Sequence, residues 1–594
     1  MSLRLRQILL PLLFIIGIEG WLQITNGNWG WGRSIHVEFL IASLAIAAIP
    51  PVRRTIWKFL RRLRRPSPRT RTLTSIGVTL FAALCLTQYA YTSGRDLFPS
   101  MHDEFQFLLQ TRMLASGRLW MPGHPLLDFF DTFYVLIQPK YAAQSFPGAA
   151  FFFIPAVWFH LPPWTCAIAI AAGIVGLFYR VVAELIDGLA SLLAAALMGI
   201  LPLLCFVSTK VLAQSPLVLL GLATVGAYLH WHRQRSAKWA AIAGFLAGFT
   251  LITRPSDALI FILPVGIAVL LDVRRKPSGA IQAITTASLA ASPWLALQLV
   301  MNFGITGHWL QTPFALYNQR DQPRLAYALN ISPQPQIPLT RVPEKQAYYA
   351  SGVSWRLAQH KPSLMWSTFW TERLPVSTLL VVPQPMLLAL LPVGLLVWRR
   401  KRAWILACGL PLFFILFTPY PLYAMHYPFV AAPSAILWVL LAPVAITAVW
   451  PKSRSFVWTA MTLFVAAVAL FPNMNTGLML QSLAFHDKML KATNSQLDTL
   501  AQKGQHAVVL FKRDLTYTNE IEPVYNTTAL WPDDELIIRA HDRGNENWKI
   551  FDYYGEKKPD RAFYRFDETK LDDPLTYLGL GSELAGGDKI TVGH

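Results

Sequence analysis

Long apolar runs alternate with short polar or basic segments over residues 1–471. About 13 of these runs are roughly 15 to 23 residues long, which is enough for a helix to cross the hydrocarbon core of a bilayer. The pattern predicts an all-α polytopic membrane protein. The expected spans fall near residues 8–22, 36–49, 73–91, 164–182, 188–207, 211–230, 238–252, 255–272, 281–303, 378–397, 403–419, 427–447 and 454–471.

Basic clusters between the runs predict the orientation of the spans. The largest cluster covers residues 53–71, and shorter ones lie at 232–235, 274–276, 399–402 and 452–454. Lys and Arg favour the cytoplasmic side, so an odd number of spans places the N-terminus inside and the C-terminal region outside. The first run has the charge pattern of a signal peptide but is not followed by a small-residue cleavage site, so we expect an uncleaved span. The short, proline-bounded stretch 149–160 is expected to lie along the outer interface.

Three regions follow from this topology. Residues 1–72 hold two transmembrane helices and a basic cytoplasmic loop. Residues 73–471 form the main transmembrane domain, with extracytoplasmic loops at 93–147 and 304–375. Residues 472–594 are predicted to be a small soluble extracytoplasmic α/β domain. It contains a helical stretch at 480–500 and strand-like runs at 506–511, 536–540 and 561–566.

Composition and charge agree with a membrane protein. The chain is 54% hydrophobic and 14% charged, and its formal charge is +19. The positive excess is confined to the membrane part, where 38 Lys and Arg stand against 14 acids; residues 472–594 carry 14 against 19. Short cytoplasmic loops explain this excess, which argues against a nucleic-acid partner. The four cysteines are scattered singly, so neither a disulfide framework nor a zinc site is indicated.

Acidic residues gather in the first extracytoplasmic loop. Of the 14 acids in residues 1–471, five lie here: Asp96, Asp103, Glu104, Asp128 and Asp131. Adjacent carboxylates at the water-facing mouth of a helical bundle can act as a general base or as metal ligands. They can also be a solvated turn or a helix N-cap, because Asp103 precedes an apolar-periodic segment.

The residues around this acid pair carry a family resemblance. Residues 102–105 (HDEF), 108–112 (LLQTR) and 116–120 (SGRLW) resemble the first large periplasmic loop of the GT-C glycosyltransferases, especially bacterial relatives of protein mannosyltransferase and lipid A aminoarabinose transferase. Similar segments follow at 128–133, 141–148, 253–255 (TRP), 425–428 (MHYP), 522–526 and 539–544. The chain departs from the pattern at 145–148, where SFPG has one proline fewer than the Tyr-Pro-Pro-Gly of many relatives.

The resemblance implies a GT-C-like fold in a bacterial inner (plasma) membrane, a polyprenyl-phosphate-linked sugar as donor, and transfer with inversion. It also implies an acidic first-loop residue as catalytic base, which we assign to Asp103, with Glu104 as a supporting or acceptor-orienting group. This agrees with the chemistry, because a hydroxyl acceptor needs a base whereas a phosphate leaving group needs neutralising cations.

Cations at the predicted outer ends of spans are candidates for binding the donor phosphate. Arg254 is the first candidate, because a cation there opposes the positive-inside preference and is costly unless it meets an anion. Its alternatives are an ion pair with Asp257 or a position among lipid headgroups. Lys210, Arg373 and His426 are further candidates for the same role.

Other loop residues are candidates for binding substrate. They are His102, Asp128, Asp131 and Tyr141. Asp128 and Asp131 either bind the sugar or cap the next helix. A divalent metal held by His102 and Asp103 is a secondary possibility; no cofactor is otherwise expected. Loop aromatics such as Tyr134 and Trp355 either stack on substrate or belong to the interfacial belt.

The sequence therefore predicts a membrane glycosyltransferase acting on an extracytoplasmic glycan, lipid or protein acceptor. The alternative is a non-catalytic transporter or flippase of lipid-linked glycans. Transporters tend to have pseudo-symmetric halves and ionisable residues near mid-bilayer. Here the acids gather in one outer loop and the spans are nearly free of them, which favours an enzyme.

Overall fold

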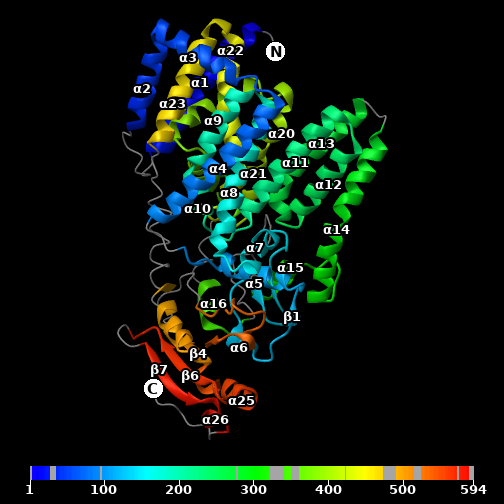
Figure 1. Ribbon diagram of the computed structural model, residues 1–594, viewed down its shortest axis with the longest axis vertical. Helices are drawn as coiled ribbons and strands as arrows, with labels where there is room; N and C mark the ends of the chain where they lie inside the picture. The colour runs from blue at the N-terminus through cyan, green and yellow to red at the C-terminus, as the bar shows by residue number, and fades with distance from the viewer. Residues whose placement is uncertain are drawn as a thin grey trace.

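The computed structural model describes residues 3–26, 35–93, 97–275, 279–321, 340–349, 360–421, 423–471, 490–491, 493–513, 523–570 and 574–586. A large helical bundle forms one end of the molecule, and a small sheet forms the other (Figure 1). The acidic loop lies between these two parts. Asp96 and Trp355 fall outside the described residues.

Each predicted span coincides with a helix or with a bent pair of helices. These are α1 (Leu3–Asn26), α2 (Ile35–Ala48), α4 (Pro68–Thr92), α8 (Pro163–Leu185), α9 (Gly188–Gly199), α11 (Gln214–Gln234), α12 (Ala237–Leu251), α13 (Pro255–Arg275), α14 (Ala280–Thr306), α19 (Leu374–Val381) with η4 (Pro385–Leu390) and η5 (Pro392–Leu396), α20 (Trp404–Ala407) with α21 (Gly409–Phe417), α22 (Ala432–Val449) and α23 (Arg454–Leu470).

In the described part of the chain, seven helices are long and apolar enough to cross a membrane, or up to nine if each of two bent pairs is one span. This shows an integral membrane protein. Residues 188–199, 237–251 and 404–417 form shorter apolar helices. The count of about 13 spans therefore stays a prediction.

The helix after the second predicted span turns sharply. The chain bends by 96° between α2 and α3 (Pro50–Leu63). Pro50 and Pro51 cannot donate backbone hydrogen bonds to a preceding turn, so the chain starts a new helix here. Five cations follow one another on α3, interleaved with Trp57, Phe59 and Leu60. This is the composition of an interfacial amphipathic helix.

The acidic loop and the segment that follows it fold as a compact unit beside the bundle. It consists of α5 (His102–Ala115), α6 (Leu127–Phe130), η1 (Ala150–Phe153), α7 (Ile154–Trp158) and an antiparallel sheet in the order β1-β3-β2. The strands are β1 (Met121–Pro122), β2 (Val135–Leu136) and β3 (Lys140–Ala143). Parts of the second loop adjoin it as α15 (Pro313–Asp321), α16 (Pro343–Ala347) and α18 (Pro362–Thr368), followed by the π-helical η3 (Phe369–Arg373).

The C-terminal region contains a four-stranded sheet in the order β5-β4-β6-β7. β4 (Ala507–Lys512) pairs in parallel with β5 (Ile537–His541) and β6 (Ala562–Asp567), while β7 (Leu575–Leu580) is antiparallel to β6. The three predicted strand-like runs are strands; β7 was not predicted. Helix α25 (Trp548–Lys557) connects β5 to β6. The predicted helix 480–500 lies partly outside the described residues, and 493–500 is helical.

This sheet shares a hydrophobic core with the acidic loop. Phe105, Leu109 and Met113 of α5 lie in one buried cluster with Tyr525 and Ile538. Phe105 stacks on Tyr525 with ring centroids 4.3 Å apart. The C-terminal region is thus packed against the helix that carries the acid pair.

Candidate functional site

The acid pair lies in the first turn of α5. Met101 is the N-cap residue, and Glu104 completes a capping box. The Glu104 carboxylate accepts hydrogen bonds from the backbone N–H groups of Ser100 at 3.0 Å and Met101 at 3.3 Å. The alternative in which Asp103 caps the helix is therefore wrong, since Glu104 satisfies the free amides at this end.

Glu104 is buried against Lys210. Its Oε2 lies 3.1 Å from Lys210 Nζ, and Oε1 accepts the backbone N–H of Val211 at 3.0 Å. Lys210 also donates to Ser100 Oγ at 2.9 Å. Both side chains are almost fully buried, at 1% and 2% exposed. The pair therefore fastens α5 to the segment that precedes α11, and both groups already have strong partners.

Asp103 is half-buried and is oriented by its neighbours. Gln106, one turn further along α5, donates from Nε2 to Asp103 Oδ1 at 2.8 Å. The Gln106 oxygen accepts the Ser145 hydroxyl at 2.8 Å. Asp103 Oδ2 lies 4.0 Å from Nε2 of His426. The carboxylate is thus held in place while keeping 29% of its side-chain surface accessible.

His426 lies beside Asp103 although the two residues are far apart in the sequence. It is the residue before η7 (Tyr427–Ala431), and it is buried. Burial and the nearby charge of Arg254 lower the pKa of His426 to about 3, so the imidazole is neutral at pH 7. Its Nε2 has no hydrogen-bond partner among the described residues. A neutral imidazole with an unused ring nitrogen therefore faces the Asp103 carboxylate.

Arg254 completes this group. Its Nε pairs with Asp257 Oδ2 at 3.1 Å, and its guanidinium lies 4.9 Å from the Tyr427 ring centroid. Burial works to lower the pKa of Arg254, but the acidic groups of Asp257, Tyr427 and Asp103 raise it overall. The sequence offered this ion pair with Asp257 as the alternative to a phosphate contact for Arg254. It engages the Nε edge of the guanidinium.

Aromatic side chains lie near Asp103 and His102. Tyr134 has its pKa raised by burial and by nearby Tyr348 and Asp103. Phe133 stacks on His102 with centroids 4.3 Å apart, and Tyr348 meets Phe133 edge to face. Burial of this kind strengthens electrostatic interactions with whatever is bound there.

The remaining candidates in the first loop lie in other networks. Asp131 accepts hydrogen bonds from Thr340 at 2.5 Å and from Lys345 at 3.0 Å, and Lys345 also meets Asp321 at 2.5 Å. Arg320 joins the same buried group, 3.2 Å from Asp131. This network joins the acidic loop to the described part of the loop 304–375.

Asp128 pairs at 3.5 Å with Arg341, which is exposed. Tyr141 is buried and donates to the Asn526 carbonyl at 3.3 Å. His102 Nδ1 lies 2.8 Å from the Tyr525 hydroxyl. These three side chains contact the second loop or the C-terminal region.

Arg373 forms hydrogen bonds with backbone carbonyl groups. Its guanidinium donates to the carbonyls of Phe417, Thr418 (3.1 Å) and Tyr420 (2.8 Å). It therefore holds the segment that leads toward His426.

No group of three or more His, Cys, Asp or Glu in the described residues could hold a metal ion. His102 and Asp103 point to different partners, Tyr525 and Gln106. Metal dependence stays a prediction.

The sequence reasoning missed three residues of this site. Gln106 was detectable, because a residue three positions along a helix lies beside Asp103. Tyr427 lies in the segment 425–428 (MHYP), but the sequence did not assign it a role. Tyr525 meets His102 only through tertiary packing, which no local pattern reveals.

Comparisons with known proteins found no matching family model and no matching curated protein. Solved structures that resemble the chain include the apo oligosaccharyltransferase of Archaeoglobus fulgidus, at 10% identity and a TM-score of 0.41, covering 67% of this chain and 55% of that one. The apo ArnT of Cupriavidus metallidurans shows 11% identity and a TM-score of 0.42, covering 87% and 98%. The structure of the same ArnT bound to undecaprenyl phosphate shows 11% identity and a TM-score of 0.43, covering 88% of this chain and 100% of that one.

The chain thus spans about half of the oligosaccharyltransferase and nearly all of ArnT. Both proteins are GT-C glycosyltransferases, the superfamily that the sequence motifs resemble. Identities of 10–11% and TM-scores of 0.41–0.43 carry no argument about the function of this chain.

Proposed function

We propose that this protein is a membrane glycosyltransferase that moves a sugar from a polyprenyl-phosphate-linked donor to an extracytoplasmic acceptor, with inversion. One observation carries the proposal. Asp103, Arg254 and His426 come from three distant segments: Asp103 Oδ2 lies 4.0 Å from His426 Nε2, and the Arg254 guanidinium lies over the ring of Tyr427, the residue after His426. A half-exposed carboxylate beside a cation and a neutral imidazole suits a base acting next to an anionic leaving group.

Asp103 is proposed as the general base. Its carboxylate accepts the proton of the acceptor hydroxyl while the hydroxyl oxygen forms a bond to the anomeric carbon. The bond from that carbon to the phosphate oxygen breaks, and the electron pair leaves with the phosphate. Gln106 fixes the position of the carboxylate at 2.8 Å, which lowers the entropic cost of this arrangement.

Arg254 is proposed to hold the donor phosphate. The leaving group gains negative charge as the bond breaks, and a cation in a partly dry site stabilises that charge more than water does. The Asp257 carboxylate holds one edge of the guanidinium. His426 stays neutral, so its Nε2 can exchange a hydrogen bond with donor or acceptor without adding charge.

The test uses the purified full-length protein with a panel of polyprenyl-phosphate sugars and candidate acceptors. Consumption of one donor with release of polyprenyl phosphate is expected. Inversion is checked by the anomeric configuration of the product. Binding or transbilayer movement of a donor without its consumption would contradict an enzyme and favour a transporter.

A further inference from the structure

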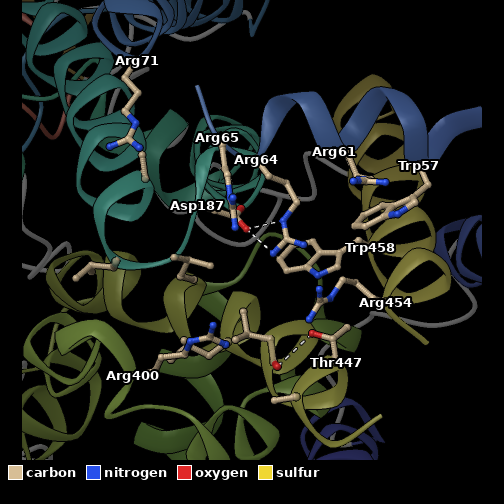
Figure 2. A pocket seen from close by; sticks show the side chains of 16 residues that line it. Trp57, Arg61, Arg64, Arg65, Arg71, Asp187, Arg400, Thr447, Arg454 and Trp458 are labelled. Atoms are coloured by element: carbon tan, nitrogen blue, oxygen red, sulfur yellow. Dashed lines mark hydrogen bonds and ion pairs between the residues drawn. The ribbon is translucent and has the colours of Figure 1, made fainter. Parts of the chain in front are cut away.

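A cavity lined by arginines lies at the end of the helical bundle away from the acidic loop. Its volume is about 790 Å³. The side chains come from α3 and the turn after it, from the start of α4, from the end of α8 and the turn after it, from the second half of α22, from the start of α23 and from Arg400 (Figure 2). The six arginines are Arg61, Arg64, Arg65, Arg71, Arg400 and Arg454.

The charge of this cavity is poorly balanced. Among the described residues that line it, Asp187 is the one acidic side chain. Asp187 is committed to Arg64, which donates from Nε to Oδ2 at 2.7 Å and has Nη2 at 2.6 Å (Figure 2). The other five arginines form no ion pair with a described acidic residue, and Arg71 Nε is buried with no hydrogen-bond partner in the described chain. Clustered cations repel one another unless an anion joins them.

Two tryptophans, several aliphatic side chains and Thr447 also line the cavity. The ring centroids of Trp57 and Trp458 lie 5.8 and 5.5 Å from the guanidinium carbon of Arg64. Leu441, Val444 and Ala448 of α22 add an aliphatic surface. A site with both surfaces suits an amphiphile whose head is a phosphate and whose body is apolar.

The position fits a membrane surface. His426 precedes η7, which leads into α22, and the last two to three turns of α22 line the cavity, so most of this 18-residue helix, which is about 27 Å long, separates the two sites. That distance is close to the thickness of a bilayer core. The basic helix α3, bent 96° from α2, forms one wall. With the acidic loop outside the cell, the cavity lies at the level of the cytoplasmic headgroups.

We propose that this cavity binds the phosphate headgroup of an anionic phospholipid from the cytoplasmic leaflet, with a preference for a headgroup that carries two phosphates. Arginines hold phosphates through paired hydrogen bonds, and five uncommitted guanidinium groups exceed what one phosphate can use. The proposal concerns a site remote from Asp103 and does not depend on glycosyl transfer.

The test compares two triple variants of the full-length protein. Arg61→Gln, Arg65→Gln and Arg454→Gln together remove three exposed cavity arginines and leave the Arg64–Asp187 pair intact. Arg54→Gln, Lys58→Gln and Arg62→Gln together remove the same charge from α3 at exposed positions that do not line the cavity. Thermal unfolding without added lipid checks that both variants fold.

Binding of a diphosphatidylglycerol, a phosphatidylglycerol and a phosphatidylcholine is measured in detergent by native mass spectrometry. We expect the cavity variant to bind diphosphatidylglycerol at least tenfold more weakly than the wild type, the control variant to stay within about twofold of the wild type, and phosphatidylcholine not to bind the wild type. Equal losses in both variants, or no loss in either, would overturn the proposal. If inorganic pyrophosphate binds the wild type while none of the lipids does, the source of the phosphate is soluble and the lipid proposal is wrong.

Discussion

At the scale of single residues, the two carboxylates of the acidic loop have different environments although they are adjacent in sequence. Glu104 is buried and held by Lys210, Ser100 and the backbone of Val211. Asp103 is half-exposed and accepts a hydrogen bond from Gln106. A base must be accessible and must accept a proton, so the structure favours Asp103 for this role.

Replacing Asp103 by Asn is expected to lower transfer by about 10² to 10⁴, or roughly 3 to 5 kcal/mol of barrier. The amide keeps the size of the carboxylate but cannot accept the proton of the acceptor. Turnover and donor binding are measured on the same preparation, with binding expected to be unchanged. Asp560→Asn is the control, because it makes the same change at an exposed C-terminal position. Wild-type turnover in Asp103→Asn would remove the base assignment.

For Arg254, replacement by Ala is expected to weaken donor use more than replacement by Lys, because Lys keeps the charge but loses the paired hydrogen bonds to phosphate. The measurement is kcat/KM for the donor. Arg118→Ala, at an exposed arginine beyond the end of α5, is the control. If Ala leaves kcat/KM within about twofold, less than ~0.5 kcal/mol, Arg254 serves only its ion pair with Asp257.

His426 is expected to make stability fall in acid. Its pKa is lowered from 6.5 to about 3 by burial and by Arg254, so the folded protein binds fewer protons than the unfolded chain. The contribution to stability is therefore complete above about pH 6.5 and is lost as the pH falls toward 3; by linkage, about 1.4 kcal/mol disappears between about pH 7.5 and pH 5.5. The glutamine of His426→Gln does not titrate, so the melting temperature of this variant should fall less than that of the wild type between about pH 7.5 and pH 5.5. Parallel curves for both proteins would contradict this.

At the scale of elements, the start of α5 is a junction of three parts of the chain. The capping box and the Lys210 ion pair hold it from the bundle side. Tyr525 holds it from the C-terminal side through His102 and Phe105. The position of Asp103 thus depends on packing that involves residues far away in sequence.

Glu104→Gln is expected to destabilise the protein by about 3 to 5 kcal/mol, because it leaves Lys210 buried without its counter-charge. The measurement is thermal unfolding in detergent. The double variant Glu104→Gln with Lys210→Met should recover much of the loss, since both charges are then gone. If the double variant is no more stable than Glu104→Gln alone, the two groups are not energetically coupled.

At the scale of the whole molecule, the candidate catalytic residues and the arginine cavity lie at opposite ends of the helical bundle (Figure 1). The acidic loop, described parts of the second loop and the C-terminal sheet adjoin one another, as the Asp131 network and the shared hydrophobic core show. Segments in direct contact cannot lie on opposite sides of a bilayer. The contacts therefore agree with one common side for all three.

Cysteine labelling from each side of the membrane tests this arrangement. In a protein whose four native cysteines are replaced by alanine, Ser116→Cys, Leu310→Cys and Ser582→Cys should react with an impermeant reagent from outside, because all three positions are exposed. Lys238→Cys, beside a basic cluster, should react only after the membrane is opened. Labelling of Ser116→Cys and Ser582→Cys from opposite sides would refute the topology.

The sequence by itself determined the helical membrane class, the helices at the expected spans and the three strands at 507–512, 537–541 and 562–567, because hydrophobic runs and their period act locally. It also drew attention to the Asp103 loop through the concentration of acids. Only the tertiary structure decided which candidates meet. Glu104 and Lys210 became a buried pair, Asp131 entered a network with Lys345, and Asp103 came to lie 4.0 Å from His426. Such partnerships join residues far apart in the chain, so the local spacing of residues does not reveal them.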